Sequence, residues 1–397
     1  MSGEERALRK LVPPHSSLAA APMSTHTLSL LAGKATDEGT RAYHARFAER
    51  FSPNFARSLD GDLLVSSLGL GTYLGECNDA EDARYAAAIR EAVSRGVNLV
   101  DTAINYRCQR AERAVGAAIH DLLAAGTVRR EELVVCTKGG YLPLDATPPA
   151  TRAEYHAYLE REFFATGVMM PEDVVAGGHC LTPSYLAHQI AASQANLGLA
   201  TLDVYYLHNP EQQLAAVEPA RFRHLIRDAF ALLEERVAAG DVGRYGCATW
   251  NGLRVAPGTR GHVSLAELVE IAREVGGDGH HFRVVQLPIN LAMSEAVRQP
   301  TQLLDPGPGT GRGGARTARA VPLLEAAYEL GIAVVASAPL MQAQLTRGLP
   351  AALQAAFPGL ATDAQRAIAF VRTLPGVCAA LVGMKSAAHL EENLAAA

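Results

Sequence analysis

Apolar runs and amphipathic stretches alternate along the chain from about residue 58 to its end. Runs such as LVVCT and LDVYYL are apolar without alternation, which is typical of parallel strands buried on both faces. Each run is followed by ten or more residues with apolar positions at helical spacing. The strands are expected at Leu64–Leu70, Asn98–Asp101, Leu133–Thr137, Leu202–Leu207, Tyr245–Ala248, Arg283–Pro288, Ala333–Ala336 and Ala379–Val382. The helices are expected at Asp82–Arg95, Arg110–Ala124, Pro183–Leu197, Pro219–Ala239, Ser264–Val275, Ala318–Leu330, Thr362–Thr373 and Ala387–Ala395.

Eight consecutive strand–helix units predict that the parallel sheet closes into a (β/α)8 TIM barrel. The alternative, an open doubly wound sheet, has a Gly-rich phosphate-binding turn after its first strand. The stretch GLGTYLG at residues 69–75 resembles such a turn, but its glycine spacing differs and the next helix begins too late. The favoured fold is therefore the closed barrel, which belongs to the α/β class. Before its first strand, SLDGDLLVS predicts an N-terminal β-hairpin that closes the bottom of the barrel.

Three segments fall outside these eight units. Residues 1–57 are rich in Ala, Ser, His and Pro, and we expect a partly disordered N-terminal extension with one helix near Thr40–Arg50. Residues 58–397 are then one barrel domain. Two insertions, at about 141–181 and 293–317, follow the third and sixth strands, at the carboxyl ends where barrel enzymes place their sites. Loops of this length commonly act as lids or are disordered.

The overall composition is that of an ordinary globular protein. The 397 residues carry a net charge of -5, so there is no basic surface for nucleic acid and no polybasic segment for a membrane surface. Neither a membrane-spanning apolar run nor a signal peptide is present, and the six cysteines form no CxxC pair. We therefore expect a cytoplasmic protein with reduced thiols and no metal site.

The use of cations is uneven. Only four lysines occur, at positions 10, 34, 138 and 385, against 32 arginines. A lysine retained against this bias is a candidate for a task that needs a compact, deprotonable ammonium group, which arginine cannot supply. Lys10 and Lys34 belong to the extension. Lys138 and Lys385 are therefore the lysines that call for a functional explanation.

Polar side chains stand where the expected strands end. The second strand ends at Asp101, with Tyr106 five residues later, the third ends at Lys138 and the fourth at His208. Taken singly, Asp101 fits a helix cap, Tyr106 a packing aromatic and His208 a core histidine. A lysine at the end of a buried strand, however, must find an anion or lose its charge. Asp101 on the neighbouring strand is the expected partner, and the four residues together indicate a catalytic site.

Eight motifs in the same order resemble those of the aldo-keto reductase superfamily and cover residues 59 to 397. The motifs are GLGTYLG, VDTAINYR with Glu112 following it, TKGGY, YYLHNP, GRYGCATW, VVQLPINL, ASAPL and LVGMKSAAHLEENL. The resemblance implies a catalytic tetrad of Asp101, Tyr106, Lys138 and His208. Tyr106 would donate the proton to the carbonyl oxygen, the Lys138 ammonium would lower its pKa, and Asp101 would hold the lysine in place. His208 would orient the carbonyl.

The resemblance also implies a nicotinamide cofactor, NADP with NAD as the alternative. Its binding residues would be Thr72, Asp101, Thr249, Gln286, Ser337, Pro339, Leu340, Gly383, Lys385, Ser386, Glu392 and Asn393. Lys385 is placed to meet a ribose 2′-phosphate, although His389 stands where many members have an arginine. Two further residues of the nicotinamide site depart from the family, since Ala248 and Thr249 replace the usual Ser and Asn or Arg.

The part of the chain expected to bind the substrate resembles the family least. The chain ends soon after the last helix and lacks the long C-terminal substrate loop of many aldose reductases, so the 141–181 insertion is expected to replace it. Tyr73, Tyr141, His208 and Trp250 are the candidate substrate-binding residues, and no metal is expected.

Three functions remain open from the sequence. The first is an NADP-dependent reductase of a small aldehyde, ketone or sugar carbonyl. The second is a sugar or alcohol dehydrogenase that uses NAD, and the third is a nucleotide-binding regulatory subunit with negligible turnover. The substrate, the physiological direction and the oligomeric state stay open.

Overall fold

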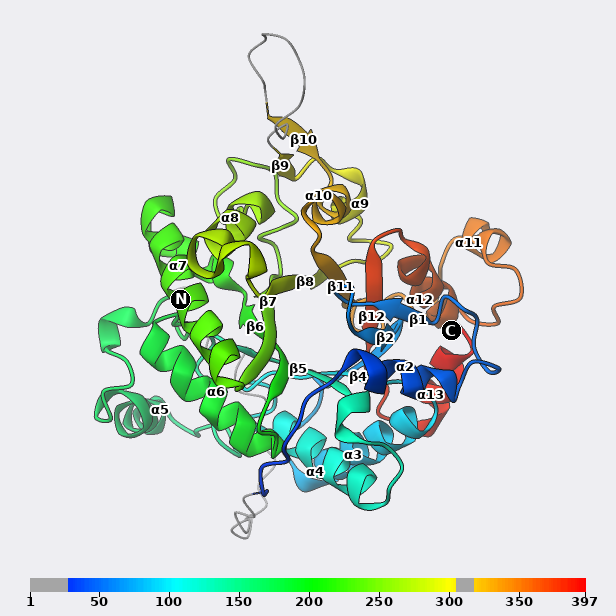
Figure 1. The fold of residues 1–397 in the computed structure, drawn as a ribbon, viewed down its shortest axis with the longest axis horizontal. Coiled ribbons are helices and arrows are strands. Elements are labelled where there is room, and N and C mark those ends of the chain that lie inside the picture. Colours follow the sequence, from blue (N-terminus) through cyan, green and yellow to red (C-terminus); the bar gives the residue numbers. More distant parts are fainter. Residues whose placement is uncertain (1–27, 305–317) are drawn as a thin grey trace.

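The computed structural model describes residues 28–304 and 318–397. The first part of the expected N-terminal extension and the second part of the 293–317 insertion lie outside these residues. Eight parallel strands form a closed barrel, confirming the predicted fold (Figure 1). In the order in which they are bonded, the strands are β11 (Ala333–Ser337), β12 (Val377–Val382), β3 (Leu68–Gly71), β4 (Leu99–Asp101), β5 (Val134–Gly139), β6 (Leu202–His208), β7 (Val242–Ala248) and β8 (Phe282–Pro288).

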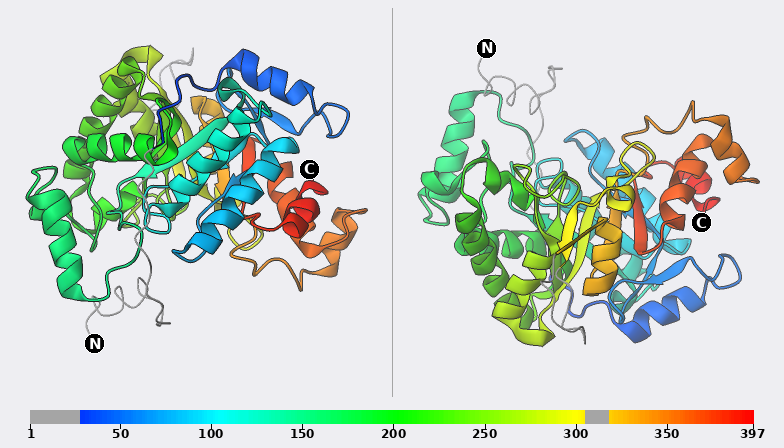
Figure 2. Two further views of the ribbon diagram at one scale, coloured as in Figure 1. Left: turned by 90° about the horizontal axis from the view of Figure 1, so that it is seen from below. Right: turned by 90° about the horizontal axis from the view of Figure 1, so that it is seen from above.

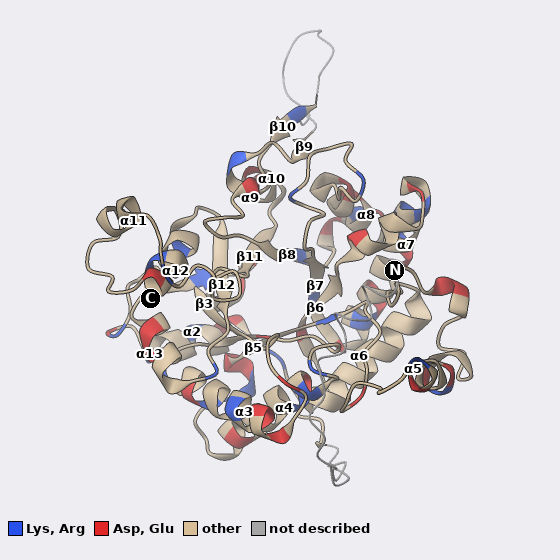
Figure 3. Ribbon diagram, turned by 180° about the vertical axis from the view of Figure 1, so that it is seen from behind, with Lys and Arg blue, Asp and Glu red and all other residues tan. Residues whose placement is uncertain are grey.

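A ring of helices covers the outside of the barrel, one principal helix after each strand (Figure 1). These helices are α3 (Asp79–Ser94), α4 (Arg110–Ala124), α6 (Pro183–Leu197), α7 (Pro219–Ala239), α8 (Leu265–Gly276), α10 (Leu323–Leu330), α12 (Asp363–Thr373) and α13 (Ala387–Leu394). Their inner faces and the outer faces of the strands form the largest apolar core. Acidic and basic residues lie mainly on these outer helices, for example α3 and α4 (Figure 3). Among the described residues, no helix is both long and apolar enough to cross a membrane.

A second, smaller core fills the barrel interior. It contains Val134, Val204, Val284 and Val335 from four strands and is closed from below by Leu59, Leu63 and Val65. The last three residues belong to an antiparallel hairpin of β1 (Ala56–Ser58) and β2 (Leu64–Ser66) or to its turn, as the Asp60-Gly61 sequence predicts. Side views place α2 (Asp37–Ala45), next to this hairpin, and α11 (Ala351–Ala356) at opposite ends of the barrel (Figure 2).

The first barrel strand is shorter than the sequence suggested. We expected one strand at Leu64–Leu70, but the run is divided at Ser67 into β2 and β3. The backbone N–H of Ser66 donates to Asn98 Oδ1 (2.8 Å), and the hydroxyl of Ser66 donates to the Leu68 carbonyl (2.8 Å). These side-chain hydrogen bonds turn the chain from the hairpin into the barrel, which the apolar pattern alone does not reveal.

The helix expected at Ala318–Leu330 begins only at Leu323. Pro322 is its N-cap, and residues Arg319–Val321 instead form β10, which pairs with β9 (Gln302–Leu304) in an antiparallel ribbon. The residue before a proline is disfavoured in the helical conformation, which accounts for the later start. The helix expected near Thr40–Arg50 is α2, which starts earlier because the Thr36 side chain caps its N-terminus.

Residues 28–45 are attached to the barrel by backbone contacts. The N–H of Leu31 donates to the Gly198 carbonyl (2.8 Å), and the N–H of Ala35 donates to Asp203 Oδ1 (2.7 Å). The other oxygen of Asp203 accepts hydrogen bonds from Arg130 Nη2 (2.8 Å) and from the backbone N–H of Val135 (2.9 Å). Asp203 is fully buried, so one carboxylate joins three segments at the bottom of the barrel.

The substitution Asp203→Ala is therefore expected to lower the free energy of unfolding by about 3–5 kcal/mol, because it leaves the buried Arg130 charge without its partner. Equilibrium urea unfolding followed by circular dichroism measures this change. Asp121→Ala is the matched control, since Asp121 forms an exposed ion pair with Arg90 and should cost less than about 1 kcal/mol. Equal, small effects of the two substitutions would contradict the role assigned to Asp203.

Candidate active site

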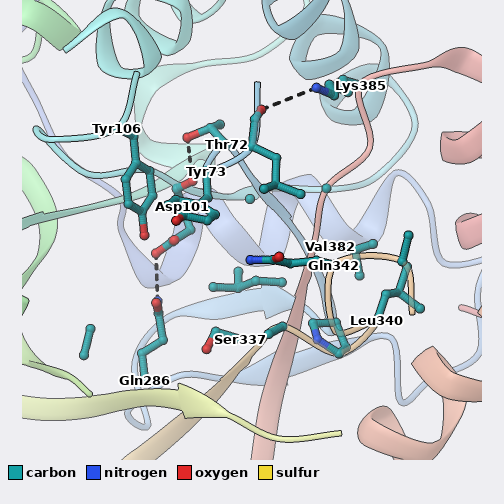
Figure 4. Close-up of a pocket in the computed structure, with 18 of the residues that line it drawn as sticks. Thr72, Tyr73, Asp101, Tyr106, Gln286, Ser337, Leu340, Gln342, Val382 and Lys385 are labelled. Atoms are coloured by element: carbon teal, nitrogen blue, oxygen red, sulfur yellow. Dashed lines mark hydrogen bonds between the residues drawn. The ribbon is translucent and has the colours of Figure 1, made fainter. Parts of the chain in front are cut away.

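A cavity of about 1260 Å³ opens at the carboxyl ends of the barrel strands (Figure 4). The candidate residues from the sequence that line it are Thr72, Tyr73, Asp101, Tyr106, Tyr141, His208, Thr249, Trp250, Gln286, Ser337, Pro339, Leu340, Gly383, Lys385, Ser386, Glu392 and Asn393. Lys138 is the exception, since it lies buried beneath the lining. The structure therefore brings together residues that are up to about 320 positions apart in the chain.

At the floor of this cavity, Asp101 and Lys138 form a buried ion pair between β4 and β5. Lys138 Nζ donates to Asp101 Oδ1 (2.5 Å) and to the Thr102 carbonyl (2.8 Å). Gln286 on β8 reaches across the barrel and donates from Nε2 to the second Asp101 oxygen (2.8 Å; Figure 4). Lys138 and Gln286 therefore each bond one oxygen of the Asp101 carboxylate, and together they orient it.

The charges of this pair stabilise each other. Burial alone would lower the pKa of Lys138, but the adjacent Asp101 carboxylate outweighs it, and the pKa of Lys138 lies above its ordinary value. Burial raises the pKa of Asp101, and this effect is opposed by the Lys138 charge and by the hydrogen bonds from Lys138 and Gln286. The site therefore holds a permanent ammonium group at neutral pH.

Tyr106 stands over this ammonium group, in the loop between β4 and α4. Lys138 Nζ is 5.0 Å from the centre of the Tyr106 ring. The ring also meets Tyr73 edge-on, with centroids 5.0 Å apart, and His208, with centroids 5.7 Å apart. Burial raises the pKa of Tyr106 to about 12, although the Lys138 charge acts in the opposite direction. Lys138 therefore acts on the pKa of Tyr106 in the expected direction, but burial of the ring outweighs its effect.

His208 ends β6 on the far side of Tyr106. Burial and the nearby Lys138 charge lower the pKa of His208 well below its ordinary value, so the imidazole is neutral at pH 7 and can donate one hydrogen bond. Its backbone carbonyl accepts a hydrogen bond from the buried His179 Nε2 (2.8 Å), and Gln213 Nε2 donates to His179 Nδ1 (2.8 Å). The ring of Tyr141 lies edge-on to both histidines, with centroids 5.0 Å from each.

The other end of the cavity is formed by the last two strands and α13. Ser337 ends β11, Pro339 and Leu340 follow it, and Gly383 and Lys385 follow β12. Ser386 is the N-cap of α13, and its hydroxyl accepts a hydrogen bond from the His389 N–H (3.2 Å). A helix N-terminus that opens into a cavity favours a negatively charged ligand.

Lys385 does not point freely into this cavity. Its Nζ is bonded to Glu81 of α3 and lies 3.5 Å from the Leu74 carbonyl (Figure 4). Glu81 is buried and is also 3.4 Å from Arg84, which lines the same cavity. The lysine therefore joins α3 to the loop after β12. A ligand phosphate at this end would meet Lys385, Arg84 and His389, and both Lys385 and Arg84 would share their charges with Glu81.

Several lining residues escaped the sequence analysis. They are Asn105, Asn209, Gln212, Arg84, Tyr85, Gln342, Ala343 and Thr346. The motifs gave a signal for two of them, since Asn105 adjoins Tyr106 in VDTAINYR and Asn209 adjoins His208 in YYLHNP. Gln342 and Ala343 belong to the loop after β11, where Ala338, Met341, Gln342 and Ala343 all have positive φ. This irregular backbone has no periodic pattern from which its position could be inferred.

Glu211 supports the site without lining it. Its Oε1 accepts hydrogen bonds from the backbone N–H groups of Trp250 (2.7 Å) and Asn251 (3.0 Å) in the loop after β7. Thr249, which precedes Trp250, is buried and has a side-chain hydroxyl without a partner in the described part of the chain. The carboxylate thus fixes the loop that presents Thr249 and Trp250 to the cavity.

The 141–181 insertion does not form the substrate wall that we expected. Only Tyr141 of this segment lines the cavity, while α5 (Arg152–Leu159) lies outside α6 (Figure 1). Leu159, Phe163 and Met169 pack with Tyr185 of α6 in a separate apolar cluster. The described part of the second insertion, residues 293–304, contributes no lining residue either. The insertion therefore uses its apolar side chains to cover the outside of the barrel and contributes only Tyr141 to the cavity lining.

Comparison with known proteins agrees with this geometry. Residues 67–257 match the model of the aldo/keto reductase family, which confirms the family suggested by the motifs. Among curated proteins, no relative matches significantly.

Solved structures of similar fold include an aldo/keto reductase from Klebsiella pneumoniae in complex with NADP and acetate, with 20% identity and a TM-score of 0.55. The match covers 86% of this chain and 89% of the other. An aldo-keto reductase from Bacillus halodurans in its holo form is 18% identical, with a TM-score of 0.54 and coverage of 86% and 90%. At these identities, the likeness shows the fold.

The support of His208 by His179 leads to a prediction of pH dependence. Burial lowers the pKa of His179 to about 4, whereas in the unfolded chain it is about 6.5. Between these values the unfolded chain binds the proton and the folded protein does not, so stability falls as the pH decreases from 6.5 to 4. Over this pH range His179 is expected to lower the free energy of unfolding by roughly 3 kcal/mol. Urea unfolding of wild type and His179→Gln at pH 7 and pH 5 tests it, since the variant should lose less stability on acidification. Parallel curves for the two proteins would show that His179 does not contribute.

Proposed function

Since residues 67–257 belong to the aldo/keto reductase family, we propose that the chain is an NADP-dependent oxidoreductase that reduces the carbonyl of an aldehyde, a ketone or a sugar. The observation that carries this proposal is the meeting of Asp101, Lys138, Tyr106 and His208 at one end of the barrel. The Klebsiella pneumoniae protein of the same fold was crystallised with NADP, which supports the choice of cofactor. The free thiols of all six cysteines accord with a cytoplasmic location.

The residues of the cavity fit a nicotinamide dinucleotide. Its volume of about 1260 Å³ exceeds the ~300–1,000 Å³ of most small-molecule sites and leaves room for a dinucleotide and a small substrate. The unpartnered Thr249 hydroxyl and the Gln286 carbonyl would hold the nicotinamide amide close to Asp101. The N-terminus of α13 with Ser386 would bind phosphate, and Lys385 with His389 would face a ribose 2′-phosphate. Bound NADPH would supply the hydride.

The chain itself would handle the proton. Tyr106 would donate the proton from its hydroxyl to the carbonyl oxygen as negative charge develops there. The Lys138 ammonium would favour the resulting phenolate, because it is the nearest positive charge and Asp101 fixes its position. The neutral His208 would donate a hydrogen bond to the same carbonyl oxygen and so orient the substrate. Tyr73, Tyr141 and Trp250 would form the apolar walls around it.

The substitution Tyr106→Phe tests the proton donor. It removes one oxygen atom, so reduction of a panel of aldehydes, ketones and aldoses should fall at least ~100-fold, while the affinity for NADPH, measured by fluorescence titration, should stay nearly unchanged. Tyr328→Phe is the matched control, because Tyr328 is 84% exposed on α10 and is not among the residues that line the cavity.

An active Tyr106→Phe variant would rule out Tyr106 as the proton donor. In wild type, tighter binding of NADH than of NADPH together with alcohol oxidation would favour the NAD-dependent dehydrogenase. Tight NADPH binding without turnover of any carbonyl would favour the regulatory subunit.

A further inference from the structure

Two cysteines face each other next to the candidate active site. Cys77 lies between β3 and α3, and Cys108 is two residues after Tyr106, between β4 and α4. Their sulfur atoms are 3.4 Å apart, and both are free thiols. Cys108 is buried, whereas Cys77 is half-buried and can be reached from solvent. The sequence gives no sign of this pair, because the two residues are 31 positions apart and in no CxxC motif.

An ion-pair network holds the two cysteine-bearing loops together. Arg107, which precedes Cys108, donates from Nη1 to Asp82 Oδ1 (2.6 Å). Arg110 is bonded to the same Asp82 (2.6 Å) and to Asp79. Both acids are in the first turn of α3, which starts two residues after Cys77. The loops are therefore fixed to each other next to the sulfur atoms, and this holds the two thiols in contact.

The environments of the two thiols differ in a way that suits stepwise oxidation. A hydrogen bond from the Cys108 thiol lowers the pKa of Cys77. Burial acts in the opposite direction, and the charges of Arg107 and Arg110 lower the pKa further. The pKa of Cys108 is raised by the same hydrogen bond and by burial. A half-buried thiol with a lowered pKa in contact with a buried thiol with a raised pKa is the arrangement of an attacking and a resolving cysteine.

We propose that Cys77 and Cys108 form a reversible disulfide when the protein meets hydrogen peroxide. The Cys77 thiolate attacks one peroxide oxygen, the O–O bond breaks and hydroxide leaves, so that Cys77 becomes a sulfenic acid. The Cys108 sulfur then attacks the Cys77 sulfur, the S–O bond breaks, and the departing oxygen takes the Cys108 proton and leaves as water. Two thiols lose two electrons in total, and the peroxide is reduced to two molecules of water.

The disulfide would act on the backbone that carries Tyr106. Arg107, Cys108 and Gln109 have φ values of 48°, 54° and 66°, which is a run of three non-glycine residues in the left-handed region. Such a run is strained and has little freedom to adjust. A disulfide brings the sulfurs to ~2.05 Å, so Cys77 or Cys108 must move by about 1 Å. This part of the inference rests on the proposed role of Tyr106, and it predicts that the oxidised protein reduces carbonyls about tenfold more slowly or worse.

Peptide mapping tests the bond itself. Reduced wild type, Cys77→Ser, Cys108→Ser and the control Cys180→Ser, each as the full chain, are treated with hydrogen peroxide and digested without reductant. A linked peptide containing Cys77 and Cys108 is expected in wild type and in Cys180→Ser, with loss of two thiols that dithiothreitol restores. The linked peptide should be absent from Cys77→Ser and from Cys108→Ser. Oxidation of Cys77 to sulfinic acid with Cys108 still free, or no loss of thiols, would overturn the proposal.

Hydrogen exchange separates this inference from the proposed function. On oxidation, the peptide that covers residues 102–109 should change its exchange rate in wild type and in Cys180→Ser, but not in Cys77→Ser. This measurement needs no substrate. It therefore shows whether the disulfide restrains the Tyr106 loop even if no carbonyl is turned over. Where turnover is found, the rate of the oxidised protein should recover with dithiothreitol. A disulfide that leaves both the exchange rate and the turnover unchanged would refute the effect on the Tyr106 loop.

Discussion

The ion pair between Asp101 and Lys138 is the constraint on which the candidate active site depends. Two opposite charges buried at the ends of adjacent strands are tolerated only when each neutralises the other and their remaining hydrogen-bonding groups are satisfied. Here the Thr102 carbonyl and the Gln286 amide satisfy them. The pair consequently has a single geometry, and that geometry sets an ammonium group under the ring of Tyr106. Loss of either charge would leave the other buried without its counter-charge.

The barrel makes this arrangement possible because closure brings distant strands to one rim. Gln286 on β8 reaches Asp101 on β4 although they are 185 positions apart. Around this centre, further buried polar residues hold the loops in place. His179 bonds the backbone of His208, and Glu211 bonds the loop that carries Trp250. The apolar cores fix the frame of the site, and these buried hydrogen bonds fix the positions of its side chains.

The apolar pattern was sufficient to predict the eight strands, because each is buried on both faces and followed by a helix. It failed where side chains or proline override periodicity, at Ser67 and at Pro322. The lysine bias and the strand-end positions indicated the pairing of Lys138 with Asp101, which is a contact between neighbouring strands. The pKa of Tyr106, the Lys385–Glu81 pair and the outward packing of the 141–181 insertion depend on tertiary burial and could not be read from spacing.

The most direct test of the account is the rate of a single turnover in Lys138→Met, followed as the oxidation of bound NADPH by a carbonyl substrate. If the lysine acts on Tyr106, this rate should fall at least ~100-fold. The dissociation constant of NADPH, measured by fluorescence, should stay within about twofold, because Lys138 lies beneath the cavity lining and not in it. An unchanged rate, or a loss of NADPH affinity as large as the loss of rate, would contradict the account.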